Sequence, residues 1–119
     1  MTWTRQQRRG AWGERVAARR LRIRGWWIVE RRYRAGGGEI DLVARRGQVL
    51  AICEVKTRTA LDARPPVGRG QIERIERAAT MLLSMRPELS ELEARRDLIL
   101  VIPRRGGPAR VRHIPHGLE

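Results

Sequence analysis

Two long segments of the chain have the apolar spacing of amphipathic helices. In residues 8–24, small and aliphatic side chains recur three, four and seven positions apart, as on one face of a helix. This stripe consists of Gly10, Ala11, Ala17, Ala18 and Leu21, and residues 69–86 have a similar stripe of Ile72, Ile75, Ala79 and Leu82. A second apolar patch on the first segment, Trp12, Val16 and Ile23, lies on its far side. We predict a helix from each segment.

The rest of the chain consists mainly of short apolar runs separated by turn residues. The runs at 26–29, 39–45, 48–57, 97–102 and 109–114 predict strands, and Arg46-Gly47 suggests a hairpin turn between the second and third. Residues 61–66 read as a loop, and residues 88–95 as a polar connection with some helical bias. The order of helix, three strands, helix and two strands predicts one α/β domain over residues 1–119, with a mixed central sheet flanked by helices.

The second and third strands are apolar on both faces, which indicates central strands covered on both sides. Pairing of Arg45 with Gln48 would place Asp41 opposite Ile52. Asp41, Glu54 and Lys56 would then project from one face, with Val43, Leu50 and Ile52. Ile40 and Leu42 would lie on the other face. An odd loop without a bulge would separate the three polar residues.

The net charge of the chain indicates a class of binding partner. Lysine and arginine number 26 against 13 acidic residues, for a net charge of +13. Such a surplus attracts polyanions and favours nucleic acid as a partner, although genome composition or thermal adaptation would produce the same bias. The first residues lack a secretory signal and no stretch reaches the length of a membrane span, so we expect a soluble, cytoplasmic protein that does not bind membranes.

The soft metal ligands are too few for a structural zinc site. The chain has one cysteine, Cys53, which falls in a predicted buried strand and is expected to pack in the core. His113 and His116 are expected at the surface, and Asp97 beside Arg95 and Arg96 is expected to form a local ion pair.

Four polar residues enter the predicted core. Glu14 is the centre of the first helix's apolar stripe, with Gly10, Ala11, Ala17 and Ala18 as its helix neighbours, so any partner must come from elsewhere in the fold. Asp41 and Glu54, as diagonal neighbours with Cα atoms about 7–8 Å apart, would repel each other unless a cation lay between them. Lys56 is the only lysine in the chain. A divalent metal site explains the group, whereas ordinary ion pairs would explain each residue alone.

Two motifs complete the argument. Gly38-Glu39-Ile40-Asp41-Leu42 followed by Glu54-Val55-Lys56-Thr57-Arg58 resembles the bacterial UPF0102, or YraN-type, proteins of the PD-(D/E)xK nuclease superfamily. The resemblance extends from the Gly13-Glu14 helix to the strand beginning near Asp97. It implies a restriction-endonuclease-like fold, similar to the Holliday-junction resolvases, with Mg²⁺ or Mn²⁺ as cofactor. Because resolvases act as dimers, it also makes a dimer an expectation by analogy.

By matching position, the resemblance implies a role for each residue of the motifs. Asp41, Glu54 and the Val55 carbonyl would be metal ligands, Glu14 would complete or support the site, and Lys56 would orient the attacking water. Arg34 and Arg58 would be phosphate contacts, with solvated surface charge as the alternative for each.

This chain departs from the family pattern at two positions. Arg32 stands where relatives have Asn, and Gln71 stands where they usually have Lys. Gln71 borders the apolar stripe of its helix and could face the acids as a catalytic residue, or it could simply begin the helix. Loss of the family lysine would weaken catalysis.

The leading expectation is a metal-dependent endonuclease acting on DNA, with branched or structured DNA as an analogy to the resolvases. The alternative is a basic nucleic-acid-binding module with a nuclease-like fold and weak or no catalysis. A basic structural protein of a ribonucleoprotein ranks third, since it leaves the buried acids unexplained. DNA and RNA both remain open as the nucleic acid.

Overall fold

The structure is a computed structural model, and it describes residues 2, 4–59 and 67–119. The elements in chain order are α1 (Arg5–Ile23), β1 (Trp27–Ala35), β2 (Gly38–Arg46), β3 (Val49–Thr57), α2 (Arg69–Met85), α3 (Pro87–Ser90), β4 (Glu93–Ile102) and β5 (Arg110–Ile114). The loop predicted at 61–66 lies outside the described residues.

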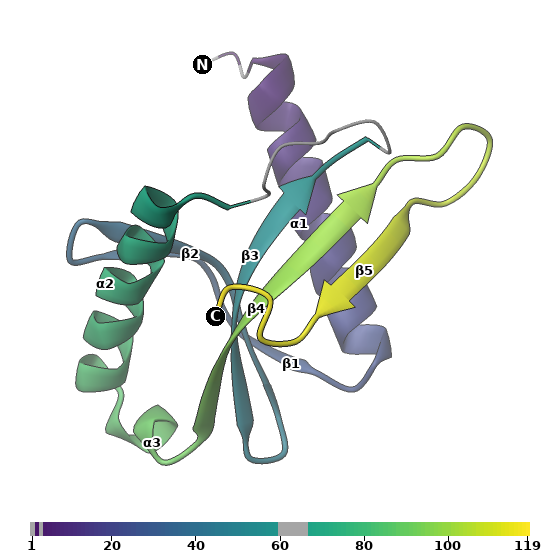
Figure 1. The fold of residues 1–119 in the computed structure, drawn as a ribbon. Helices are drawn as coiled ribbons and strands as arrows, with labels where there is room; N and C mark the ends of the chain where they lie inside the picture. Colours follow the sequence, from purple (N-terminus) through teal and green to yellow (C-terminus); the bar gives the residue numbers. More distant parts are fainter. Residues whose placement is uncertain (1, 3, 60–66) are drawn as a thin grey trace.

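The five strands form one sheet in the order β1-β2-β3-β4-β5, in which only β3 and β4 run parallel. Helix α2 packs on one face and α1 on the other, as Figure 1 shows. The central strands β2 and β3 are buried on both faces, as their two-sided apolar pattern predicts. The fold is therefore the predicted mixed α/β domain, and it is compatible with a restriction-endonuclease-like architecture.

Two strands are longer than their apolar runs. Strand β1 continues past Val29 through the basic residues to Ala35, and β4 begins at Glu93, inside the segment predicted as a polar connection. Both extensions pair through the backbone, which places no demand on side-chain hydropathy. The N–H of Glu93, for example, donates to the carbonyl of Gln48 at 2.7 Å. Trp26 precedes the strand and is buried against α1.

The register between β2 and β3 differs from the prediction by two residues. Arg46 pairs with Val49 and Arg45 with Leu50, so the turn residues are Gly47 and Gln48. Gly47 has φ of 61°, a left-handed conformation that arginine adopts only at a cost, and this moves the turn one residue along the chain. An even shift by itself does not move side chains from one face of the sheet to the other. It places Asp41 next to Glu54 rather than opposite Ile52.

The prediction for Ile40 was wrong. Ile40 packs on the α2 side with Val43, whereas Leu42 packs on the α1 side. The ladder between β1 and β2 passes from the Arg31–Leu42 pair to the Tyr33–Ile40 pair without a pair between them. At the residue skipped in β1, Arg32, the backbone has φ of 50°. This irregularity turns β2 at Asp41, so the strand exchanges faces there.

Two glycines allow the helices to approach this end of the sheet. A Cβ on Gly13 would overlap Oγ1 of Thr57, and a Cβ on Gly38 would overlap the backbone carbonyl oxygen of Arg74. Helix α1 is thereby seated against the end of β3, and α2 against the start of β2. Both helices present residues to the space around Asp41 and Glu54.

Candidate functional site

A small cavity of about 40 Å³ lies where β2, β3 and α2 meet. Its lining residues are Glu39, Asp41, Glu54, Gln71 and Arg74. Three residues singled out from the sequence, Asp41, Glu54 and Gln71, therefore lie together, although Gln71 is on a different element. Gln71 faces the acids, as its place beside the apolar stripe of α2 suggested.

The carboxylate of Asp41 is fixed by the neighbouring strand. Its Oδ2 accepts a hydrogen bond from the backbone N–H of Val55 at 2.8 Å. The β2–β3 ladder has its last pair at Leu42 and Cys53, and Asp41 and Glu54 are the next residue of each strand. The two acids thus face each other where a further pair would stand. Because the N–H and C=O of one strand residue point to the same side, the carbonyl of Val55 is directed toward this pair.

Glu54 is almost completely buried, with 6% of its side chain exposed. Burial raises its pKa to about 9, and the hydrogen bond and negative charge of Asp41 act in the same direction. With that pKa, Glu54 is protonated at neutral pH when no cation is bound.

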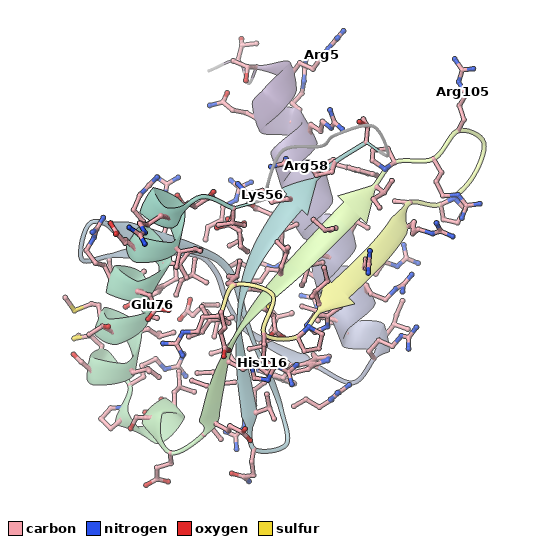
Figure 2. The ribbon with its side chains drawn as sticks, in the orientation of Figure 1. Arg5, Lys56, Arg58, Glu76, Arg105 and His116 are labelled. Atoms are coloured by element: carbon pink, nitrogen blue, oxygen red, sulfur yellow. The ribbon has the colours of Figure 1, made fainter. Side chains whose placement is uncertain are left out.

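The ammonium of Lys56 lies on the same side of β3 as Glu54, with Nζ 3.9 Å from Glu54 Oε1. Its positive charge opposes the increase in the pKa of Glu54 but is outweighed by burial. The Lys56 side chain is 21% exposed, so part of it is open to solvent. Figure 2 shows it at the end of β3, with Arg58 just beyond.

Glu14 has the distant partner that its helix neighbours could not provide. Nε of Arg32, on β1, donates to Glu14 Oε2 at 2.7 Å. Burial raises the pKa of the half-buried Glu14, and the negative charges of Asp41 and Glu39 add to that increase. Glu14 and Asp41 are therefore close enough to interact, but Glu14 lines different cavities, of about 300 and 310 Å³, which Arg32 also lines.

The acids do not form a closed cage. Within the described ranges, no group of three or more His, Cys, Asp or Glu side chains is gathered so that it could hold a metal ion. The site consists of a carboxyl pair, an adjacent backbone carbonyl and a lysine. Glu14 lies to one side, bound to Arg32.

The two predicted phosphate contacts lie outside the small cavity. The side chain of Arg34 is 74% exposed and reaches Glu39, with Nε 3.4 Å from Oε1. Arg58 follows β3, where its backbone N–H donates to the carbonyl of Val101 at 3.0 Å. Its Nη1 donates to the carbonyl of Thr57 at 3.1 Å. Arg34 therefore meets one acid of the cavity, Glu39.

Sequence reasoning missed two of the cavity residues. Glu39 lies two positions before Asp41 in the same motif, and Arg74 lies one helical turn after Gln71. The helical spacing was a usable signal for Arg74, because residues three apart share a face of a helix. Arg74 provides positive charge beside the acids on the same helix face as Gln71.

His113 does not lie free at the surface as predicted. Its Nε2 is 2.6 Å from Oδ2 of the fully buried Asp97, which also accepts two hydrogen bonds from Arg95 Nε and one from Arg95 Nη2. Burial by itself would raise the pKa of Asp97, but the hydrogen bonds from His113, Arg95 and the His116 N–H lower it. The predicted pair with Arg95 is confirmed, and the network attaches the C-terminal segment to β4.

The other two predictions about soft ligands are confirmed. His116 is exposed, and Cys53 is completely buried in the core. Burial raises the pKa of the Cys53 thiol well above its usual value, so it packs as a small apolar side chain. None of the helices in the described part of the chain has the length and hydropathy needed to cross a membrane.

A five-stranded mixed sheet between two helices, with a carboxyl pair and a lysine where the central strands diverge, is the arrangement expected of restriction-endonuclease-like proteins. The chain belongs to the family described as Uncharacterised protein family UPF0102, whose sequence profile matches residues 13–101. Membership of the PD-(D/E)xK superfamily is consistent with this family.

Relatives from distant bacteria match most of the chain. A UPF0102 protein of Paramagnetospirillum magneticum is 45% identical over 114 residues, covering 92% of this chain and 85% of that protein. A UPF0102 protein of Kineococcus radiotolerans is 40% identical over 111 residues, covering 88% of each. A UPF0102 protein of Brucella canis is 44% identical over 98 residues, covering 82% and 78%. These names carry no activity, so the function must be argued from the site.

Proposed function

We propose that this protein is a divalent-metal-dependent endonuclease that hydrolyses phosphodiester bonds in DNA. The observation that carries the proposal is the carboxyl pair of the buried Glu54 and the partly buried Asp41, with the ammonium of Lys56 3.9 Å from Glu54. A buried carboxyl group whose pKa is raised beside a second acid is unfavourable for stability, and such perturbed groups concentrate at functional sites.

The donor atoms of this pair suit Mg²⁺ or Mn²⁺. Both cations prefer oxygen ligands, and Mg²⁺ is commonly held by one or two carboxylates together with waters and substrate phosphates. Asp41, Glu54 and the Val55 carbonyl match that requirement, and the proton on Glu54 would be released when a cation took its place. A bound cation would supply positive charge for the phosphate and activate a water for attack.

Each of the remaining residues of the site can contribute a different interaction to catalysis. Lys56 can hold the attacking water by hydrogen bonds and stabilise negative charge as it develops on the phosphate. The Gln71 amide can orient a water or a phosphate oxygen, and Arg74 can bind the phosphate by charge. Glu14 supports the site indirectly, since Arg32 holds its carboxylate beside Asp41.

The charge of the chain supports a polyanionic substrate. The net charge is +13, and Figure 2 shows Arg5, Arg58 and Arg105 toward the same end of the molecule as Lys56. Arginine at that end would draw nucleic acid to the cavity by long-range attraction. Branched or structured DNA is the substrate that the resemblance to resolvases suggests.

The test is cleavage of labelled single-stranded, duplex, flap and four-way-junction DNA, and of RNA, with Mg²⁺, Mn²⁺ or EDTA. Wild type is compared with Asp41→Ala, Lys56→Ala and the control Glu91→Gln, whose exposed carboxyl group lies after α3. We expect metal-dependent products from wild type and the control alone. Equal cleavage by all four proteins would assign the activity to a contaminant and remove the proposal.

The second candidate is a nucleic-acid-binding module without catalysis. The specific observation that favours it is Gln71, which places a neutral amide in the cavity, at the position where the family resemblance implies a lysine. It predicts no cleavage of any substrate and salt-sensitive binding that survives Asp41→Ala, since arginine contacts to phosphates need no metal.

A further inference from the structure

A groove of about 480 Å³ lies on the other side of α1 from Glu14. One wall is a single face of α1 and the other is the connection between β4 and β5 with the start of β5. Its lining residues are Trp12, Val16, Arg19, Arg20, Ile23, Gly107, Pro108, Ala109 and Val111. The second apolar patch of the first helix, Trp12, Val16 and Ile23, thus has no role in the cavity of Asp41 and forms this wall instead.

The groove combines an aromatic ring with positive charge. Trp12 packs partly against the core cluster under α1, and the remainder of its side chain lines the groove. Among the described residues, Arg19 and Arg20 are the charged members of the lining and none of its members is an acid. Ile23 is 71% exposed, which leaves apolar surface open to a ligand.

The rim has the same character as the lining. Arg104, Arg105 and Arg110 are exposed on the connection and at the start of β5, and Figure 2 shows Arg105 at the outer tip of that connection. Arginines around an apolar wall that carries an aromatic ring suit single-stranded nucleic acid. Its bases can stack on the aromatic ring while the arginines bind its phosphates.

The groove is adjacent to the candidate active site. Gly13 is in contact with Thr57, the residue after Lys56. The two residues next to Gly13 in α1 point in different directions. The side chain of Trp12 lines the groove, and that of Glu14 lines a cavity together with Arg32. A strand crossing the end of β3 could therefore reach both places, which lie on either side of the same helical turn.

We propose that this groove binds an unpaired nucleic-acid strand, with a base stacked on Trp12 and phosphates bound by Arg19 and Arg20. Joined to the proposed function, on which this step rests, it defines the substrate class as DNA in which a single-stranded segment adjoins the cleaved bond. A second copy of the chain is the competing occupant, but it would bring two surfaces of like charge together.

The experiment measures binding of a labelled oligothymidine and of a blunt duplex in EDTA, by fluorescence anisotropy and by quenching of tryptophan emission. Trp12→Leu keeps an apolar side chain against the core but cannot stack. Arg19→Gln/Arg20→Gln removes the charges from the wall, and Arg22→Gln is the matched control, exposed on α1 outside the groove. Unfolding midpoints identify any variant that loses its fold.

We expect Trp12→Leu to weaken oligothymidine binding about tenfold or more, with duplex binding unchanged. The double arginine variant should reduce the salt dependence of oligothymidine binding by about 1.4 in log–log slope, since two phosphate contacts are lost. Arg22→Gln should bind both ligands as wild type does. If Trp12→Leu does not fold, the exposed arginines still decide the question.

Three results separate the possible failures. Oligothymidine binding that is the same in all variants would overturn the groove as a nucleic-acid site. A wild-type dimer that Ile23→Glu converts to a monomer would make the groove an interface between copies and would also overturn it. Groove-dependent binding without cleavage of any substrate would retain the groove and remove only the nuclease proposal.

Discussion

Nε of Arg32 lies 2.7 Å from Oε2 of Glu14 and joins β1 to α1 beside Asp41. The same arginine has a left-handed backbone, with φ of 50°, at the position where the β1–β2 ladder is interrupted. Asparagine and glycine adopt such left-handed conformations readily, whereas arginine does so at a cost. The ion pair therefore holds an unfavourable backbone conformation next to the site.

This relationship predicts an inverted order of stability for two substitutions. Arg32→Ala and Arg32→Gly both remove the guanidinium, but only glycine accepts φ of 50° without a steric penalty. We expect Arg32→Gly to be more stable than Arg32→Ala by about 1 kcal/mol in urea unfolding. The matched pair Arg31→Gly and Arg31→Ala, one residue earlier in the ladder, should show the usual order, with alanine more stable. An alanine variant at position 32 as stable as the glycine variant would contradict the backbone argument.

The close contact of Gly13 in α1 with Thr57 in β3 predicts that substitutions at the two positions are coupled. A methyl group on Gly13 would overlap Thr57 Oγ1 but would lie at an ordinary distance, 3.7 Å, from Thr57 Cβ. Gly13→Ala should therefore destabilise the protein by about 1–3 kcal/mol, as overpacking usually does. In a Thr57→Ala background the same substitution should be nearly neutral. A double-mutant cycle on unfolding free energies measures this difference, and additive effects would show that the helix and the strand are not in contact there.

The sequence predicted the central strands and the grouping of their acids because both depend on the alternation of side chains. Asp41 and Glu54 stayed on one face although the register moved by two residues, since an even shift preserves the faces. The exchange of faces at Ile40 could not be predicted. It depends on the left-handed backbone of Arg32, and arginine is not a residue that indicates such a conformation.

Contacts between elements that are distant along the chain also could not be predicted from the sequence. His113 meets Asp97 because β5 pairs with β4 in a register that sets His113 opposite Ile99, and nothing in either segment specifies that register. The position of Arg74 could have been predicted, because helical spacing places it beside Gln71. The roles of these residues in catalysis stay predictions.

The Asp97 network predicts how the fold responds to acid. The pKa of Asp97 is lowered in the folded state, so the ionised carboxylate contributes stability above its usual pKa of 3.8 and that contribution is lost as pH falls below it. Asp97→Asn should cost about 3 kcal/mol at neutral pH, because it leaves buried partners without their charge. The variant should also lose less stability than wild type between about pH 5 and about pH 2. Urea unfolding across this range is the measurement. A parallel decline in both proteins would remove Asp97 as the acid-sensitive group.

We predict that replacing Lys56 by arginine keeps the positive charge at this position but lowers the activity. A guanidinium is planar and larger than an ammonium, so it cannot occupy the same place 3.9 Å from Glu54 and orient the same water. If the proposed nuclease activity is found, Lys56→Arg should lower kcat about 100-fold while DNA binding in EDTA is retained. The control is Arg45→Lys, on the exposed end of β2, which should leave kcat unchanged. A Lys56→Arg variant as active as wild type would show that only positive charge is needed.

The carboxyl pair links stability, pH and metal binding. The pKa of Glu54 is raised to about 9 in the folded state, so its neutral form stabilises the fold fully below its usual value of 4.5 and this stability is lost as pH rises toward 9. In EDTA, the unfolding temperature of wild type should therefore fall between about pH 5 and about pH 9, whereas that of Glu54→Gln should stay nearly constant. If the pair binds Mg²⁺ or Mn²⁺ as proposed, the cation would compete with the proton on Glu54, so the increase in unfolding temperature that it causes in wild type should grow with pH across the same range. Glu54→Gln and Asp41→Asn should show little of that increase, and Glu91→Gln should match wild type. An unfolding temperature that responds to metal equally at every pH, or equally in Glu54→Gln, would place the cation away from this pair.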